Sequence, residues 1–179
     1  MPKVVDRNAK RQMVVSLTRE LIRREGIQAV SMRDIAHAAG SSTAVISHYF
    51  ANKGDLLLHI YRDNLRAARE RRRAISSDTL EELLLFCDEI LPLTAESRDN
   101  WAISLAFTAM ATTDERFAEE FRENLRVARD QFCERLNKLV DTGIIAPLDT
   151  AWGARRLLSQ LHGVATEATL DPSDWLPER

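Results

Sequence analysis

The stretch SMRDIAHAAGSSTAVISHYF, residues 31–50, decides the fold of this 179-residue chain. It contains two short helical segments separated by Gly40, a residue that readily adopts the positive φ of a tight turn. Ser31 followed by Asp34 is the pattern of a helix N-cap with a reciprocal acidic partner. Apolar Ile35 on the first segment can pack against the second. The stretch therefore predicts a helix-turn-helix, whose second helix is the one that enters a DNA groove.

The second helix of this pair has an exposed face of short polar groups, namely Ser42, Thr43, Ser47 and His48. Side chains of this kind can approach base edges or phosphates. Two alternatives remain open from the residues alone. Two short helices with a glycine between them also occur as a simple corner in other helical proteins, and Ser31 and Ser42 can be caps without any other role.

Outward from this stretch, helical periodicity continues along the whole chain and no strand alternation is visible. We expect an all-α protein, with a three-helix helix-turn-helix domain followed by a second helical domain. The breaks in the pattern predict further helices at about residues 7–25, 53–75, 79–93, 98–112, 114–141 and 150–170. Asp114 and Asp149 are expected N-caps. The predicted domains are residues 1–52, a connecting helix at 53–77, and residues 78–179.

Charge is divided unevenly between the two parts of the chain. Residues 1–73 contain 15 Lys or Arg and 7 Asp or Glu, whereas residues 74–179 contain 10 and 20. Only the first part is therefore expected to meet a polyanion. The run of Arg69, Arg71, Arg72 and Arg73 can be a DNA-facing patch, but a solvated helix end is the interpretation we favour here.

The residues argue against catalysis. The chain has no glycine-rich phosphate loop, no nucleophile with a matching base and no metal-ligand spacing, so we expect neither an enzyme nor a cofactor or metal. The remaining alternative is a helical adaptor that binds no DNA. Such an adaptor would explain the helices but not the basic first part.

Location can also be inferred from composition. No stretch is apolar enough to span a bilayer, and the start of the chain lacks the apolar core of a signal peptide. Cys87 and Cys133 match no disulfide framework, which favours reduced thiols. We therefore expect a cytoplasmic protein.

A longer pattern runs from Gly26 through the helix pair to Asn52-Lys53-Gly54-Asp55, and it closely resembles the N-terminal domain of the TetR family of repressors. The resemblance covers roughly residues 8–60. The form Ile-Ser-His-Tyr-Phe at 46–50, followed by Lys53, is most similar to the subgroup of BetI, the choline-responsive repressors. The rest of the chain resembles that subgroup in length and helix order.

The resemblance implies a sequence-specific repressor that small molecules release from a palindromic operator. It places Ser31 and Arg33 at phosphates and the start of the second helix against the bases. The implied DNA contacts are Ser31, Arg33, Ser42, Thr43, Ala44, Ser47, His48, Tyr49 and Lys53. Tyr49 can instead be a core aromatic, although Phe50 is the better core candidate.

The resemblance also implies a homodimer through the helices at 114–141 and 150–170, because a palindromic operator needs a two-fold partner. An effector is expected between helices of the acidic part, near Trp101, Phe107 and Trp152. Cation–π contact with the two tryptophans would suit a quaternary amine. An unrelated apolar effector, or none, remains open.

Overall fold

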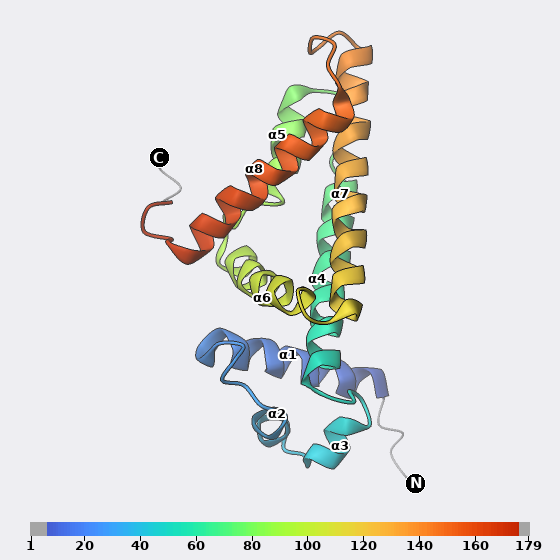
Figure 1. Cartoon of the computed structure of the whole chain (residues 1–179). Coiled ribbons are helices and arrows are strands. Elements are labelled where there is room, and N and C mark those ends of the chain that lie inside the picture. Colours follow the sequence, from blue (N-terminus) through green and yellow to red (C-terminus); the bar gives the residue numbers. More distant parts are fainter. Residues whose placement is uncertain (1–6, 176–179) are drawn as a thin grey trace. The chain divides into compact units, whose positions relative to one another are not determined.

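The computed structural model describes residues 7–175, and within that range the chain forms helices and no strands (Figure 1). Its contacts divide the chain into two compact units, unit 1 up to Asp63 and unit 2 from Asn64 onward. Each unit is described separately below. The helices are α1 (Arg7–Glu25), α2 (Met32–Ala38), α3 (Thr43–Ser47), α4 (Lys53–Arg73), α5 (Leu80–Asp88), α6 (Ala95–Ala111), α7 (Glu115–Asp141) and α8 (Thr150–Leu170).

Unit 1 has the predicted helix-turn-helix of α2 and α3, packed with α1 and the first part of α4. Helix α1 ends before Gly26, whose φ of 81° reverses the chain, and Gly40 with φ 57° does the same between α2 and α3. The buried side chains of Ile35, Ile46 and Phe50 join these elements. Burial of these apolar groups, rather than the propensity of such short helices, holds α2 and α3 in place.

The predicted caps are confirmed. The Ser31 hydroxyl accepts a hydrogen bond from the Asp34 amide at 3.3 Å, and the Asp34 carboxylate accepts one from the Ser31 amide at 2.8 Å. The Ser31 hydroxyl, and to a smaller extent the Ser31 amide, donates to the Asp34 carboxylate and lowers the pKa of Asp34, because the charged carboxylate is the better acceptor. Asp114 and Asp149 cap α7 and α8 through the same physical need to satisfy free amides.

Three predicted helix ends differ from the structure. Helix α5 ends at Asp88 instead of 93, because tight turns at Ile90 and Leu91 lead into Pro92, which disfavours helix in the residue before it. Helix α6 begins at Ala95 instead of 98, with Thr94 and Ser97 forming its capping box. Helix α4 ends at Arg73 instead of 75, where two i→i+3 bonds tighten the last turn.

The domain division also takes a different place. Unit 1 ends inside α4, after Asp63, whereas the sequence predicted residues 53–77 as a separate connecting helix. The first turns of α4 supply buried side chains such as Leu56 and Ile60 to unit 1, and its last turn supplies Arg72 to the interior of unit 2. The helix is thus part of two cores.

Unit 2 is built on α7 and α8, which lie side by side and are joined by the loop that contains Gly143 (Figure 1). Its core includes Phe86 of α5 and Phe132 of α7, whose rings meet edge to face at 4.9 Å between centroids. Leu136, Ala154 and Leu158 continue the same core between α7 and α8. None of the helices in the described range is both long and apolar enough to cross a bilayer.

Replacing Phe132 by Ala is expected to lower the free energy of unfolding by about 3–5 kcal/mol, because it leaves a cavity at a fully buried position. Urea denaturation followed by circular dichroism measures this loss. The control is Leu84→Ala, at a side chain that is 58% exposed, which should change stability by no more than about 0.5 kcal/mol. Equal effects of the two substitutions would contradict the described core.

Candidate functional site

The exposed surface of α3 and its cap carries the predicted contact residues together. Ser42, Thr43, Ala44, Ser47 and His48 are all exposed, while Ile46 between them is fully buried. The Ser42 hydroxyl caps α3 by accepting from the Val45 amide at 3.3 Å. Thr43, Ala44 and Ser47 have small side chains, so the backbone of α3 can approach another surface closely. This geometry suits a helix that enters a groove.

The start of α2 adds a cation to this region. Arg33 is exposed, and its guanidinium makes no hydrogen bond or ion pair with any described residue. Ser31 is exposed as well, but its hydroxyl is engaged with Asp34. An exposed arginine in the first turn of a helix, with free amides beside it, can bind a phosphate.

Tyr49 and Phe50 differ in burial, and Phe50 is the core residue of the two, as the sequence predicted. Tyr49 is half-buried, whereas Phe50 is buried and packs its ring 5.5 Å from that of His59. The Arg11 guanidinium lies 5.0 Å from the centroid of the Phe50 ring. Phe50 therefore belongs to the core of unit 1, and the Tyr49 hydroxyl remains the part of this pair that can reach solvent.

Lys53 has a structural contact that the sequence did not reveal. Its ammonium donates to the carbonyl oxygen of Ile27, in the loop after α1, at 2.6 Å. Partial burial lowers the pKa of Lys53. The bond ties the first residue of α4 to the loop between α1 and α2, and it uses one of the three ammonium donors. The other two can still serve the predicted phosphate contact.

Arg7 is a further candidate that sequence reasoning missed. Its guanidinium donates to the carbonyl of His48 at 3.4 Å, so the start of α1 lies beside the end of α3. Its side chain is exposed, and Lys10 follows one turn later. The basic residues that open α1 were the available signal, but their proximity to α3 depends on a contact across 41 residues.

The interpretation of the arginine run as a solvated helix end is wrong for Arg72. Arg71 and Arg73 are exposed, but Arg72 is only 6% exposed and its guanidinium lies 5.8 Å from the centroid of the Phe86 ring. The helical period explains the difference, because Arg72 lies on the face of α4 that packs into unit 2.

The three aromatic residues predicted for the effector occupy different environments. Trp101 is half-buried, with its indole N–H donating to the Ile90 carbonyl at 2.6 Å and its ring against His162. Phe107 is buried against Phe117. Trp152 is 57% exposed. Within one protomer, therefore, the exposed Trp152 does not form a wall of a buried cage.

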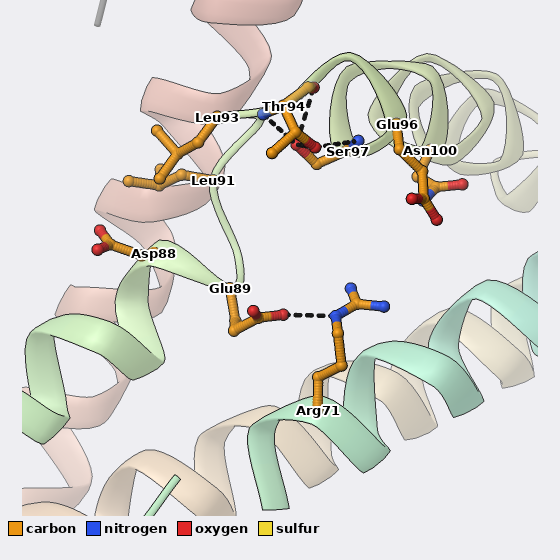
Figure 2. A pocket seen from close by; sticks show the side chains of 9 residues that line it. All are labelled: Arg71, Asp88, Glu89, Leu91, Leu93, Thr94, Glu96, Ser97 and Asn100. Carbon is orange, nitrogen blue, oxygen red and sulfur yellow. Dashed lines mark hydrogen bonds and ion pairs between the residues drawn. The ribbon is translucent and has the colours of Figure 1, made fainter. Parts of the chain in front are cut away.

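A pocket of about 340 Å³ opens in unit 2 where α4, the end of α5 and the start of α6 meet (Figure 2). Arg71 and Glu89 point toward each other across it and form an ion pair at 2.7 Å. Asp88 and Glu96 add negative charge, so the lining carries a net negative charge. The described residues contain no group of three His, Cys, Asp or Glu that could hold a metal ion.

Two family models match the chain. Residues 14–60 match the model described as bacterial regulatory proteins of the tetR family. Residues 79–179 match the model of the C-terminal domain of BetI-type transcriptional repressors. The first match covers the helix pair of unit 1, and the second covers most of unit 2.

Whole-length relatives agree with these matches. The chain is 25% identical to the HTH-type transcriptional regulator PksA of Bacillus subtilis, over 96% of this chain and 84% of that protein. It is 27% identical to the HTH-type transcriptional regulator BetI of Burkholderia mallei, over 85% of this chain and 84% of that protein.

Solved structures share the fold. A transcriptional regulator from Saccharomonospora viridis, crystallised in complex with choline, superposes with a TM-score of 0.84 at 24% identity, covering 90% of this chain and 85% of that one. A TetR transcription regulator from Haloarcula marismortui superposes with a TM-score of 0.83 at 25% identity, covering 91% and 87%.

Replacing Lys53 by Met, which keeps the aliphatic stem and removes the ammonium, is expected to destabilise unit 1 by about 1–2 kcal/mol through loss of the bond to Ile27. Urea denaturation gives the value. Lys10→Met is the matched control, because the Lys10 ammonium bonds to no described residue. If both variants unfold at the same urea concentration as the wild type, the contact of Lys53 with Ile27 does not stabilise unit 1.

Proposed function

Because this chain belongs to the TetR family of bacterial transcriptional regulators, with a BetI-type C-terminal domain, we propose that it is a repressor released from its operator by a small molecule. The operator is palindromic, and the chain binds it as a homodimer in the cytoplasm. The exposed polar surface of α3 in a strongly basic part of the chain is the observation that carries this proposal.

In this proposal α3 lies in the major groove of duplex DNA. Thr43, Ala44 and Ser47 are on its exposed side, where small side chains can meet base edges. Ser42 and His48 lie at the two ends of the helix, closer to the sugar-phosphate backbone. Contacts of the first kind select a sequence, while those of the second kind set the position of the helix on the duplex.

Phosphate contacts come from the elements around α3. Arg33 supplies a free guanidinium at the start of α2, and Lys53 supplies its two remaining ammonium donors at the start of α4. Arg7 and Tyr49 lie next to the end of α3 and extend the same surface. Each neutralised phosphate releases counterions, so affinity should fall steeply as salt rises.

Arg33→Ala is expected to weaken binding to the operator and to unrelated duplexes alike, and to reduce the salt slope by about 1, because one phosphate contact is lost. Fluorescence anisotropy with duplex from the region upstream of the gene, and with a shuffled duplex, measures both quantities. Arg98→Ala is the control, since Arg98 is an exposed arginine of α6 in unit 2. No binding of the wild type to either duplex would favour the helical adaptor instead.

Unit 2 supplies the dimer contact in this proposal. Trp152 is a large apolar side chain on the outer surface of α8, and Ser159 and Gly163 are small exposed residues farther along the same helix. A Cβ added at Gly163 would meet no atom within 4 Å, so a second helix can approach α8 closely there. We assign α7 and α8 to the interface, and Trp152 to its buried centre, where aromatic residues contribute most.

Trp152→Glu is expected to convert the dimer to monomers at micromolar concentration, because it buries a charge in the interface. Operator affinity should then fall by about 10²-fold or more, as the second half-site is lost. Sedimentation velocity and anisotropy measure the two effects. Leu84→Glu, at a similarly exposed apolar position on α5, should leave both unchanged. If the Trp152→Glu protein remains dimeric, the dimer interface does not include Trp152.

The effector acts through unit 2 and helix α4. This helix begins at Lys53, beside the DNA-binding elements, and ends inside unit 2, so a change at its C-terminal end can be carried to unit 1. The effector needs only different affinities for the two forms, and a coupling of about 1–3 kcal/mol changes DNA affinity roughly 5- to 150-fold. The regulator from S. viridis was crystallised with choline, which makes choline a required comparison in any search for the effector.

A further inference from the structure

Two arginines are buried on one phenylalanine ring in the interior of unit 2. Arg72 of α4 is 6% exposed and Arg135 of α7 is 7% exposed. The Cζ atoms of Arg135 and Arg72 lie 3.8 Å and 5.8 Å from the centroid of the Phe86 ring. Cation–π attraction offsets part of the cost of removing these charges from water, but only part.

The counter-charge that such a pair requires is missing from the described residues. None of their carboxylates lies within 4.0 Å of the Arg72 or Arg135 guanidinium. Glu89 acts on Arg72 from farther away, but it is already bonded to Arg71. Burial, and to a smaller extent the neighbouring Arg69, lowers the pKa of Arg72 to about 10, so Arg72 is still charged at neutral pH. Buried cations without an acidic partner are rare in proteins.

Hydrogen-bond donors exceed acceptors in the same interior. Four buried N–H groups have no acceptor among the described residues, namely Nε and Nη2 of Arg69, Nε of Arg72 and Nε of Arg135. Two acceptors of α7 are also buried without a partner, Oδ1 of Asn124 and Oε1 of Gln131. An unmatched donor in the interior costs about 1–3 kcal/mol, so an excess of donors points to a ligand rich in acceptors.

Arg135 and Arg72 differ in their hydrogen bonds. Nη2 of Arg135 donates to the carbonyl oxygens of Arg72 and Ile75 at 3.1 Å each, so this guanidinium holds the end of α4. The Arg72 guanidinium forms no hydrogen bond with any described residue. Arg69 is one helical turn earlier on the same face of α4. Arg69 and Arg72 are therefore the groups available to a ligand.

Aromatic rings lie among the neighbours of Arg72, together with the charged groups of Arg69, Arg71, Arg135 and Glu89. His162 is close enough for Arg72 to lower its pKa, an effect that adds to the larger effect of burial, so the imidazole is neutral at neutral pH. The Trp101 ring packs edge to face on His162 at 5.4 Å. The Phe86 ring and the pair of His162 and Trp101 therefore place apolar surface near Arg72. A small, strongly hydrated dianion would lose more solvation here than a monoanion with an apolar body.

We propose that Arg69 and Arg72 anchor an anion site in unit 2 that takes a monocarboxylate with an aromatic or aliphatic body. The carboxylate accepts from the two guanidinium groups, and its apolar part packs against the half-buried Trp101. The proposal rests on the proposed function, because it names the chemical class of the effector. It also assigns a reason for the unpaired charge of Arg72. A quaternary amine would be repelled by the same arginines.

The test uses the full-length protein and three carboxylates, benzoate, phenylacetate and octanoate, as sodium salts. Choline chloride and sodium phosphate at the same ionic strength are the comparisons. At about ten times its Kd, at least one carboxylate should raise the Tm by about 3–6 °C and should weaken operator binding in the anisotropy assay. Choline and phosphate should do neither.

Arg72→Met separates a ligand anchor from a structural group. Without carboxylate its Tm should equal or exceed that of the wild type, because a buried unpaired charge has been removed. The shift caused by carboxylate should disappear. Arg73→Met, at the exposed neighbour on α4, should retain the full shift. Arg69 is half-buried, and Arg69→Met should reduce the Tm shift caused by carboxylate. This variant replaces Arg72→Met in the test if the Arg72→Met protein does not fold.

Several results would overturn the anion site. They are a Tm unchanged by all three carboxylates, a shift with choline or phosphate alone, and a carboxylate shift that survives both Arg72→Met and Arg69→Met. Operator binding by the wild-type protein without added ligand tests the proposed function independently of the anion site. A repressor that binds its operator but ignores carboxylates would thus refute the anion site and leave the proposed function standing.

Discussion

Two cationic side chains that donate to backbone carbonyls fasten the two ends of helix α4, a helix that gives buried side chains to both units. At its start, Lys53 donates to Ile27 in the loop before α2. At its end, Arg135 donates to the carbonyls of Arg72 and Ile75. The second contact also follows the helix dipole, since a cation is favourable at a helix C-terminus. Because α4 contributes to the cores of both units, these bonds anchor each unit to the same helix.

The two halves of the chain use charge in opposite ways. In unit 1 Arg33 is exposed and unengaged, as expected of a side chain that meets a polyanion in water. In unit 2 Arg72 is buried beside the Phe86 ring, where electrostatic interactions are stronger and an unmatched charge is more costly. The first arrangement suits nonspecific attraction to DNA. The second suits selective binding of one small anion.

The structure changes the role that we assign to the aromatic residues. The sequence predicted a cage of tryptophans for a quaternary amine, which requires aromatic faces around one cavity and no competing cation. Trp152 is largely exposed, and we now assign it to the proposed dimer contact. Trp101 remains inside unit 2, but its surroundings include Arg72 through His162. Protein cations there favour a ligand of the opposite charge.

The sequence by itself determined the features that depend on residues three or four positions apart. The capping box of Ser31 and Asp34, the turn at Gly40 and the caps Asp114 and Asp149 were all predicted, because each is a local interaction within one turn. The exposed polar face of α3 followed from helical periodicity in the same way. The resemblance to a known family then predicted that this face contacts DNA.

Only the tertiary structure decided which distant groups meet. The partner of Lys53 is 26 residues away, and those of Arg135 are 60 and 63 residues away. Periodicity shows that a helix has an apolar face, but it does not show which helix covers that face. Arg72 was for that reason expected in solvent, and Trp152 in a pocket. Their burial and exposure depend on how α4, α5, α7 and α8 pack, which no short stretch of sequence contains.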